Sequence, residues 1–460
     1  MADTYDVIVL GAGPTGENVA SRAVRGGLTA AIVESELVGG ECSYWACMPS
    51  KALLRPVGVV AEARDVQGVT GARLEPEQVL ARRDSFTDDW KDDSQVGWLD
   101  SRGVDLFRGS GRITADRRVM VGETELRARC AVVVCTGTRA VVPPSLAEVR
   151  PWTSREATSA RTVPGRLAIV GGGVAGCEMA AAWQGLGAQV TLLARRRLLG
   201  RLPSFAGDLV ASGLREAGAD VRLSASVTKA ARDGDGPVTL TLEDGTSVEA
   251  DEVLAAAGRA PRTEDIGLEA VGLEPGSWLD VDETLRVRWE GESDGGWLYA
   301  AGDVNHLALL THMGKYQARI CGDAIAARAH GREPAVTDRS SKSCVPQVVF
   351  TVPEVASVGL TREQAEAAGL AVRVVEFEIG KVAGALEFAD GYTGHAQMVV
   401  DESRRVLVGA TLAGPGVGEM IHAATVAVAG GVPLDLLWHA VPPYPTISEV
   451  WLRLLEEYGL

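Results

Sequence analysis

Short apolar runs that lead into glycine-rich turns recur along the chain and predict parallel strands followed by helices. The run Tyr5–Leu10 is followed by a Gly-x-Gly-x-x-Gly turn, and a helix is expected from about Pro14. The glycines of this turn are Gly11, Gly13 and Gly16. A second apolar run, 29–33, ends at Glu34, where an acid can hold a ribose hydroxyl pair. Because such glycines let a pyrophosphate approach the backbone, the segment predicts a dinucleotide site.

The same arrangement returns about 160 residues later in the chain. An apolar run begins at Arg166, and the second helix is expected to begin at Val174. The glycines of this second turn are Gly171, Gly173 and Gly176. A chain with two such units usually binds two dinucleotides, although a copy that is kept only for structural reasons is the alternative.

The residues after the next strand distinguish the two nicotinamide coenzymes. The apolar run 189–193 ends at Ala194, so no acid stands where one would hold an unmodified ribose. Arg195 and Arg201 follow it instead. Arginine binds a 2′-phosphate by charge-assisted hydrogen bonds, whereas an acid repels it. The sequence therefore favours NADPH over NADH, and a solvated basic turn is the alternative.

The pattern changes from about residue 341 onward. Strands are expected near Val372–Phe377, Gly394–Val400 and Arg405–Gly409, with helices around Ala423–Ala429 and Ile447–Leu455. Strands and helices mixed in this way are typical of an α+β module.

Composition narrows the class of protein without naming a reaction. A chain of 460 residues is too long for one core, and about three domains are expected. The net charge of −16 argues against nucleic acid and anionic membrane surfaces as partners. No apolar run approaches a membrane span, and the first residues lead directly into a strand, so no signal peptide is expected. An odd number of cysteines, seven, favours a reducing cytoplasm.

Two of these cysteines, Cys42 and Cys47, lie five positions apart in the segment 39–51, GGECSYWACMPSK. Residues three or four apart share a helix face, so a five-residue step needs a distorted first turn to bring the sulfurs together. Such a pair can open and close as a dithiol and disulfide, with the thiolate stabilised by a helix N-terminus. Two buried cysteines at chance spacing are the alternative.

With its flanking glycines and Pro-Ser-Lys, this segment resembles the redox-active segment of the FAD-dependent pyridine nucleotide-disulfide oxidoreductases. Lipoamide dehydrogenase, glutathione reductase and mercuric reductase belong to that family. Four further stretches resemble the family in the expected order, at 132–138, 254–261, 297–303 and 348–360. The resemblance therefore covers essentially the whole chain.

The resemblance implies a fold with two doubly wound, Rossmann-like α/β nucleotide-binding domains and an α+β dimerisation domain. The implied segments are 1–150 and 265–338 for FAD, 151–264 for NADPH, and 339–460 for the interface. Besides the first glycine turn with Pro14 and Glu34, the implied cofactor residues are Gly40, Glu41, Cys42, Lys51, Gly111, Thr136, Gly137, Gly258, Arg259, Gly302, Asp303 and Thr311. Thr311 is expected to open a helix whose N-terminus stabilises negative charge on the reduced flavin. No metal site is expected.

The resemblance also implies roles in electron transfer. Lys51 and Glu178 form an ion pair beside the flavin N5, Cys47 is the charge-transfer thiolate, and Cys42 attacks the acceptor. A surface lysine and an ordinary first-turn helix acid are the alternatives for Lys51 and Glu178. The active site of a homodimer would be completed by the partner's C-terminal domain.

One segment departs from the family pattern. Members that exchange disulfides carry His-Pro-Thr-x-Ser-Glu near the C-terminus, where the glutamate orients the histidine. Here Tyr444 stands in place of the histidine, and Glu449 is kept. The reference pKa of tyrosine is about 10 and that of histidine about 6.5, so tyrosine is a poor proton shuttle at neutral pH. His439 is close in sequence, but an ordinary surface or packing role is expected for it.

Three functions stay open. The first is an NADPH-dependent reductase that passes electrons through FAD and Cys42–Cys47 to an acceptor, with a disulfide favoured. The second is an NAD(P)H reductase of quinones, metals or other acceptors, for which the missing histidine is no handicap. The third is a flavin sensor without turnover, which the intact cysteine pair disfavours. Tyr444 and the arginines after Ala194 disfavour dihydrolipoyl dehydrogenase.

Overall fold

The computed structural model describes residues 3–289 and 296–460. The chain divides into two compact units, and each unit is assembled from three segments of the sequence. Unit 1 contains 1–48, 84–140 and 258–342, and unit 2 contains 49–83, 141–257 and 343–460. In the described part of the chain, no helix has both the length and the apolar character needed to cross a membrane.

Unit 1 is built on a seven-stranded sheet in the order β3-β2-β1-β6-β5-β4, with β16 also paired to β6. Its strands are β1 (Asp3–Leu10), β2 (Ala30–Glu34), β3 (Val104–Arg108), β4 (Gly111–Ala115), β5 (Arg118–Val121), β6 (Thr124–Val134) and β16 (Leu298–Ala300). β1 runs parallel to β2 and to β6, so the carboxyl ends of the three strands meet at one edge. The central residues Val7, Ile8 and Val9 are fully buried, which explains their continuous apolar run.

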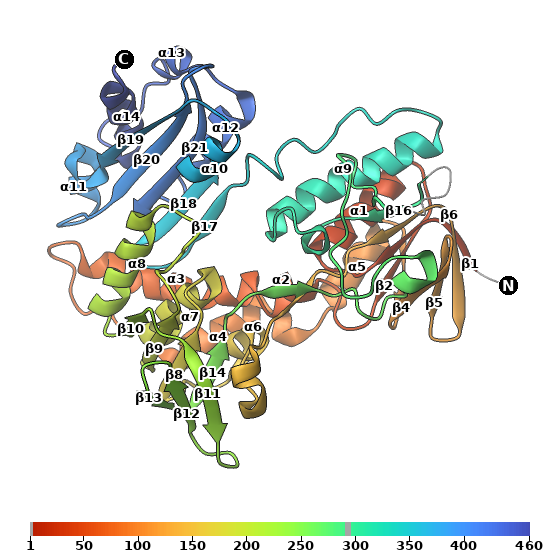
Figure 1. Ribbon diagram of the computed structural model, residues 1–460, viewed down its shortest axis with the longest axis horizontal. Coiled ribbons are helices and arrows are strands. Elements are labelled where there is room, and N and C mark those ends of the chain that lie inside the picture. Colours follow the sequence, from red (N-terminus) through yellow and green to blue (C-terminus); the bar gives the residue numbers. More distant parts are fainter. Residues whose placement is uncertain (1–2, 290–295) are drawn as a thin grey trace. The chain divides into compact units, whose positions relative to one another are not determined.

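Two helices of unit 1 pack against each other beside this sheet, α1 (Pro14–Arg25) and α9 (Thr311–Ala329) (Figure 1). α1 begins with proline at its first position, where the missing N–H costs nothing. Glycines allow the close approach, because a Cβ on Gly314 would lie 2.3 Å from the Thr15 hydroxyl oxygen. Unit 1 also contains α2 (Gly40–Tyr44), α5 (Asp93–Ser101) and the pair β7 (Thr138–Ala140) and β15 (Arg259–Pro261).

Unit 2 contains a parallel four-stranded sheet in the order β10-β9-β8-β14. Its strands are β8 (Arg166–Val170), β9 (Gln189–Ala194), β10 (Asp220–Leu223) and β14 (Glu252–Ala255). The helices that accompany it are α3 (Cys47–Arg64), α4 (Pro76–Phe86), α6 (Ser154–Ser159), α7 (Val174–Gly185) and α8 (Ser204–Glu216). A three-stranded antiparallel sheet is inserted, with strands β11 (Val227–Arg232), β12 (Val238–Leu242) and β13 (Ser247–Ala250).

The C-terminal part of unit 2 forms an antiparallel five-stranded sheet in the order β17-β18-β21-β20-β19 (Figure 1). The strands are β17 (Gln347–Val349), β18 (Glu354–Gly359), β19 (Val372–Glu378), β20 (His395–Asp401) and β21 (Val406–Gly414). The helices are α10 (Arg362–Ala367), α11 (Ala383–Phe388), α12 (Ile421–Gly430), α13 (Leu434–Leu437) and α14 (Val450–Tyr458). α12 packs on β18 and β21, and α14 packs on β19 and β20.

The predicted fold class is confirmed, with parallel Rossmann-like sheets and a separate α+β module. One expected helix differs, because Ile447–Leu455 is a 3₁₀ turn, Ile447–Glu449, followed by α14. The division into 1–150, 151–264, 265–338 and 339–460 groups residues by the ligand they would hold and stays a prediction.

Candidate functional site

The first glycine turn leaves an open place beside the start of α1. Gly11 has φ +97°, and a Cβ on Gly16 would lie 1.9 Å from the Gly11 carbonyl oxygen, so both positions need glycine. A Cβ on Gly13, by contrast, would have no described atom within 4 Å. The turn is therefore tight at its two ends and open in the middle, next to a helix N-terminus, as a bound pyrophosphate requires.

The second glycine turn repeats this geometry in unit 2. Gly171 has φ +131°, and a Cβ on Gly176 would again lie 1.9 Å from a carbonyl oxygen, that of Gly171. Gly173 faces open space, and α7 begins at Val174. Two independent turns of the chain thus provide the same cradle for a diphosphate.

Carboxylates of unit 1 lie at the edge where the strands end. Glu34, the last residue of β2, accepts hydrogen bonds from the backbone N–H groups of Ala12 (2.7 Å) and Glu36 (2.8 Å). Asp303 follows β16, where its Oδ2 accepts from the Thr138 hydroxyl at 2.8 Å and lies 3.4 Å from Arg259. Both acids are held in fixed positions by neighbouring groups, as ribose-binding or ribityl-binding acids need to be.

The other residues expected near FAD lie in the same unit, except Lys51, which is in unit 2. Arg262 donates to Glu41 at 2.8 Å, and Gly40 contacts the Gly13 backbone so closely that a Cβ would come within 2.9 Å. The hydroxyl oxygen of Thr136 is buried and has no hydrogen-bond partner among the described residues. Positions with positive φ are Gly137, Gly258 and Gly302. Gly111 begins β4, where a Cβ would press on Leu10.

The two cysteines lie on successive helices, the first short and the second long. Cys42 is in α2, which ends at Tyr44, and Cys47 is the first residue of α3. Trp45 has φ −137°, so the helical path is interrupted between them. The break replaces the distorted first turn that the five-residue spacing predicts, and it brings the thiols into hydrogen-bond contact. Neither cysteine is part of a disulfide in this structure.

The surroundings of the pair distinguish its two sulfurs. The Cys47 sulfur lies 3.3 Å from the hydroxyl oxygen of Thr311, the first residue of α9. The pKa of Cys42 is raised above its ordinary value, first by its hydrogen bond to Cys47 and then by burial, while Thr311 and Lys315 oppose the rise. The contact between the two sulfurs therefore makes the Cys42 thiol harder to deprotonate while both are reduced.

In unit 2, Lys51 and Glu178 form an ion pair. The Lys51 Nζ lies 2.6 Å from Glu178 Oε2, and the Glu178 side chain is only 5% exposed. The other oxygen, Oε1, accepts from the backbone N–H of Phe350 at 3.1 Å. The Nζ also lies 5.0 Å from the centre of the Phe350 ring, within cation–π range. The charge of Lys51 is thus held by two residues, Glu178 through its carboxylate and Phe350 through its ring, which are also hydrogen-bonded to each other.

The two arginines expected at the coenzyme phosphate follow the end of β9. Arg195 and Arg201 are exposed, and among the described residues neither guanidinium has an ion-pair partner. Free guanidinium groups beside a dinucleotide turn suit a phosphate.

The candidate residues near the C-terminus differ in their exposure to solvent. Tyr444 is 77% exposed, and His439 is also exposed. Glu449 is buried, and its Oε1 accepts from Arg453 at 2.5 Å while its Oε2 is buried without a partner in the described chain.

Sequence reasoning missed four residues of this region: Glu17, Arg262, Lys315 and Phe350. Each acts across elements that are distant in the chain, so no local spacing signals it. Only Phe350 lay in a stretch that had been singled out, at 348–360.

The residues therefore fit two dinucleotides. FAD matches the open middle glycine of the first turn through its pyrophosphate, and the fixed acids Glu34 and Asp303 through its ribose and ribityl hydroxyls. The Thr136 hydroxyl, which has no partner among the described residues, is a further group that FAD would satisfy. No group of three or more histidine, cysteine or acidic residues suitable for a metal ion is found in the described part of the chain.

Comparisons with known proteins agree across the whole length. The family "Pyridine nucleotide-disulphide oxidoreductase" matches residues 5–331, and its dimerisation domain matches 345–454. Dihydrolipoyl dehydrogenase 3 of Pseudomonas aeruginosa is 34% identical over 98% of this chain and 97% of its own length. Mercuric reductase of Staphylococcus aureus is 29% identical over 97% of this chain and 81% of its own. The crystal structure of LpdA from Mycobacterium tuberculosis matches with a TM-score of 0.83, 26% identity and complete coverage of both chains.

Proposed function

Since this chain belongs to the pyridine nucleotide-disulphide oxidoreductase family, whose enzymes are FAD-dependent oxidoreductases, we propose that it oxidises NADPH and delivers the electrons through Cys42–Cys47 to an acceptor. The favoured acceptor is a disulfide. The observation that carries the proposal is the cysteine pair, with its sulfurs in contact and one of them beside the N-terminus of α9.

FAD, when bound, supplies the hydride acceptor between coenzyme and thiols. The side chains around the cofactor then have separate roles. Thr311 and the start of α9 favour negative charge at Cys47, while Cys42 keeps the proton and is the sulfur that attacks the acceptor after deprotonation. Lys51, fixed by Glu178, supplies a positive charge for the step in which NADPH gives up its hydride.

A homodimer is part of the proposal. Large exposed apolar side chains are frequent in the segment that matches the family's dimerisation domain. They include Leu386, Phe388, Val426, Leu436, Trp438, Val441 and Tyr444. Exposed apolar side chains in a dimerisation domain are expected to be covered by a second copy of the chain. We also place the enzyme in the cytoplasm, because the odd number of cysteines favours a reducing compartment.

Tyr444 decides which disulfides are good substrates. A histidine would protonate the leaving thiolate, a contribution of typically about 10²–10⁴-fold that tyrosine supplies poorly near pH 7. Steady-state turnover of NADPH with a panel of acceptors should show weak activity with glutathione disulfide and lipoamide, and Tyr444→His should raise it. Tyr444→Phe should cost little with quinones. Fast wild-type reduction of these disulfides, with a large loss in Tyr444→Phe, would show that the tyrosine is an effective acid and overturn this part of the proposal.

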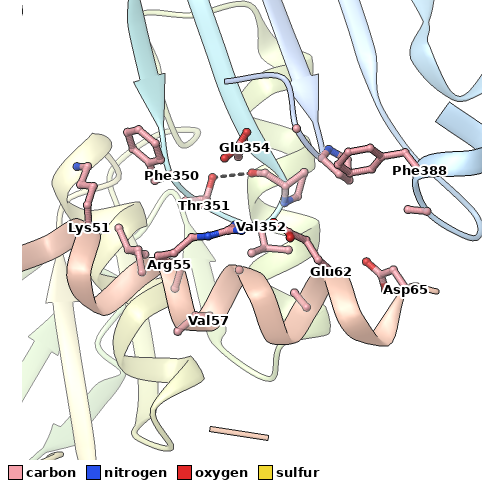
Figure 2. A pocket seen from close by; sticks show the side chains of 18 residues that line it. Lys51, Arg55, Val57, Glu62, Asp65, Phe350, Thr351, Val352, Glu354 and Phe388 are labelled. Atoms are coloured by element: carbon pink, nitrogen blue, oxygen red, sulfur yellow. Dashed lines mark hydrogen bonds and ion pairs between the residues drawn. The ribbon is translucent and has the colours of Figure 1, made fainter. Parts of the chain in front are cut away.

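A quinone-like acceptor is the second candidate, and a cavity in unit 2 favours it. The cavity measures about 240 Å³ and lies between α3 and the loop Phe350–Glu354 (Figure 2). Its walls are largely apolar, with Leu54, Val57, Ala61, Ala181, Val352 and Pro353 among them. Lys51 and Phe350 lie at one end, as Figure 2 shows, and the Arg55–Glu62 ion pair spans 2.8 Å on the helix. Apolar walls with a few fixed charges suit a small planar molecule.

Filling this cavity should separate the two candidate acceptors. In Ala61→Trp, the indole would occupy the space beside α3, so the KM for quinone-like acceptors should rise about tenfold while disulfide turnover is unchanged. Ala81→Trp, at an exposed position of α4 away from the cavity lining, is the matched control. Unchanged quinone kinetics in Ala61→Trp would remove the cavity from the reaction.

A further inference from the structure

Glu17 is a buried acid that the proposed electron pathway does not use. It lies in the first turn of α1, directly after the third glycine of the turn, and is only 7% exposed. Its Oε1 is buried and has no hydrogen-bond partner in the described residues. A carboxyl oxygen that is buried without a hydrogen-bond partner destabilises the folded chain, so a purely structural role does not explain Glu17.

Three elements meet around this acid. A Cβ on Gly40 of α2 would come within 2.9 Å of the Gly13 Cα at the start of α1, and Gly314 of α9 packs equally closely on Thr15. Two charged groups on neighbouring elements act on Glu17, Lys315 on α9 and Glu34 on β2, and Glu17 itself acts on Tyr44 of α2. Only Lys315 among them is a cation.

Lys315 also acts on the reactive thiol. Its positive charge favours the thiolate of Cys42, against the effects of burial and of Cys47. The charge of the same ammonium group therefore acts on an acid of α1 and on a thiol of α2. Whether Glu17 is charged determines how much of the lysine's positive charge remains uncompensated for Cys42.

We propose that Glu17 acts through Lys315 to set the pH at which Cys42 becomes a nucleophilic thiolate. Glu17 does not contact the reacting atoms and works only by compensating the charge of Lys315. The idea rests on the proposed role of Cys42 but concerns its ionisation alone. It gives the subunit its own control over this proton. A protonated Glu17 leaves Lys315 free to stabilise the thiolate, and an ionised Glu17 neutralises it.

The sign of the effect follows from the acid's surroundings. Burial raises the pKa of Glu17 to about 7, Lys315 opposes that rise, and Glu34 adds to it. Glu17 therefore changes charge near neutral pH. Without Lys315, nothing in this set would lower the pKa of the acid, so Glu17 would stay protonated through neutral pH.

The test is the rate of Cys42 alkylation by iodoacetamide against pH, read by peptide mass spectrometry on the FAD-loaded, dithiothreitol-reduced protein. Glu17→Gln should move the midpoint about one pH unit lower, because the lysine is no longer compensated. Lys315→Met should move it about one unit higher. The double variant should match Lys315→Met, since Glu17 is already neutral there.

Glu123→Gln is the matched control, because it removes the same charge from an exposed position of unit 1. Its profile should coincide with that of the wild type. A Glu17→Gln profile that also coincides with the wild type, at unchanged flavin content, would overturn the proposal, as would additive shifts in the double variant. Alkylation needs no NADPH turnover, so failure of the proposed function would leave this result readable.

Discussion

Cys47→Ser should lack the long-wavelength charge-transfer absorbance that the wild-type enzyme develops on two-electron reduction. The band requires a thiolate against the flavin, and the structure distinguishes Cys47 as the sulfur beside Thr311 at the N-terminus of α9. Cys42→Ser should show the band without reduction, because Cys47 then has no disulfide partner. Both variants should lose disulfide turnover by about 10³-fold or more, since the two sulfurs act as one unit.

The matched control for these variants is Cys130→Ser. Cys130 is a partly buried free thiol of β6 in the same unit, outside the hydrogen-bonded pair. It should keep the band and the turnover of the wild type. A charge-transfer band that survives in Cys47→Ser would show that the thiolate against the flavin is not that of Cys47.

Arg195→Ala and Arg201→Ala should each raise the KM for NADPH. Each guanidinium is exposed and unpaired among the described residues, so its loss removes charge-assisted bonds worth about 1–3 kcal/mol, or roughly 5- to 150-fold in kcat/KM. Kinetics with NADH should barely change, because NADH has no 2′-phosphate. The measurement is kcat/KM for both coenzymes at one acceptor concentration.

Arg196→Ala is the control for these two arginines. It removes an exposed positive charge from the same loop, between the two positions, and should have the smaller effect on NADPH. Equal or better turnover of the wild-type enzyme with NADH would contradict the choice of coenzyme, whatever the variants show.

The sequence was most informative where function depends on backbone geometry. In both turns, the first and third glycines lie where a side chain would collide with the backbone. The Gly-x-Gly-x-x-Gly pattern shows this constraint directly in a short stretch of sequence. The ends of the strands followed from the same pattern, since β2 ends at Glu34 and β9 at Ala194. The pairing of Lys51 with Glu178 came from family resemblance, because the two residues are 127 positions apart.

The remaining features depend on tertiary packing. The interruption at Trp45 is a break between two helices and not a distortion within one, which spacing alone could not distinguish. The bond from Phe350 to Glu178 uses a backbone N–H, which every residue type except proline has. Glu17 looks like an ordinary first-turn helix acid in the sequence, and only its burial beside Lys315 and Glu34 makes it unusual.

The most direct test of the electron pathway is the alkylation of Cys42 in the anaerobic enzyme before and after one equivalent of NADPH. Air-oxidised enzyme should resist iodoacetamide at Cys42, because its sulfur is bonded to Cys47. One equivalent of NADPH should then make Cys42 reactive and produce the charge-transfer band, and addition of an acceptor should reverse both. Equal alkylation of Cys42 with and without NADPH, during normal turnover of an acceptor, would show that the electrons bypass the cysteine pair.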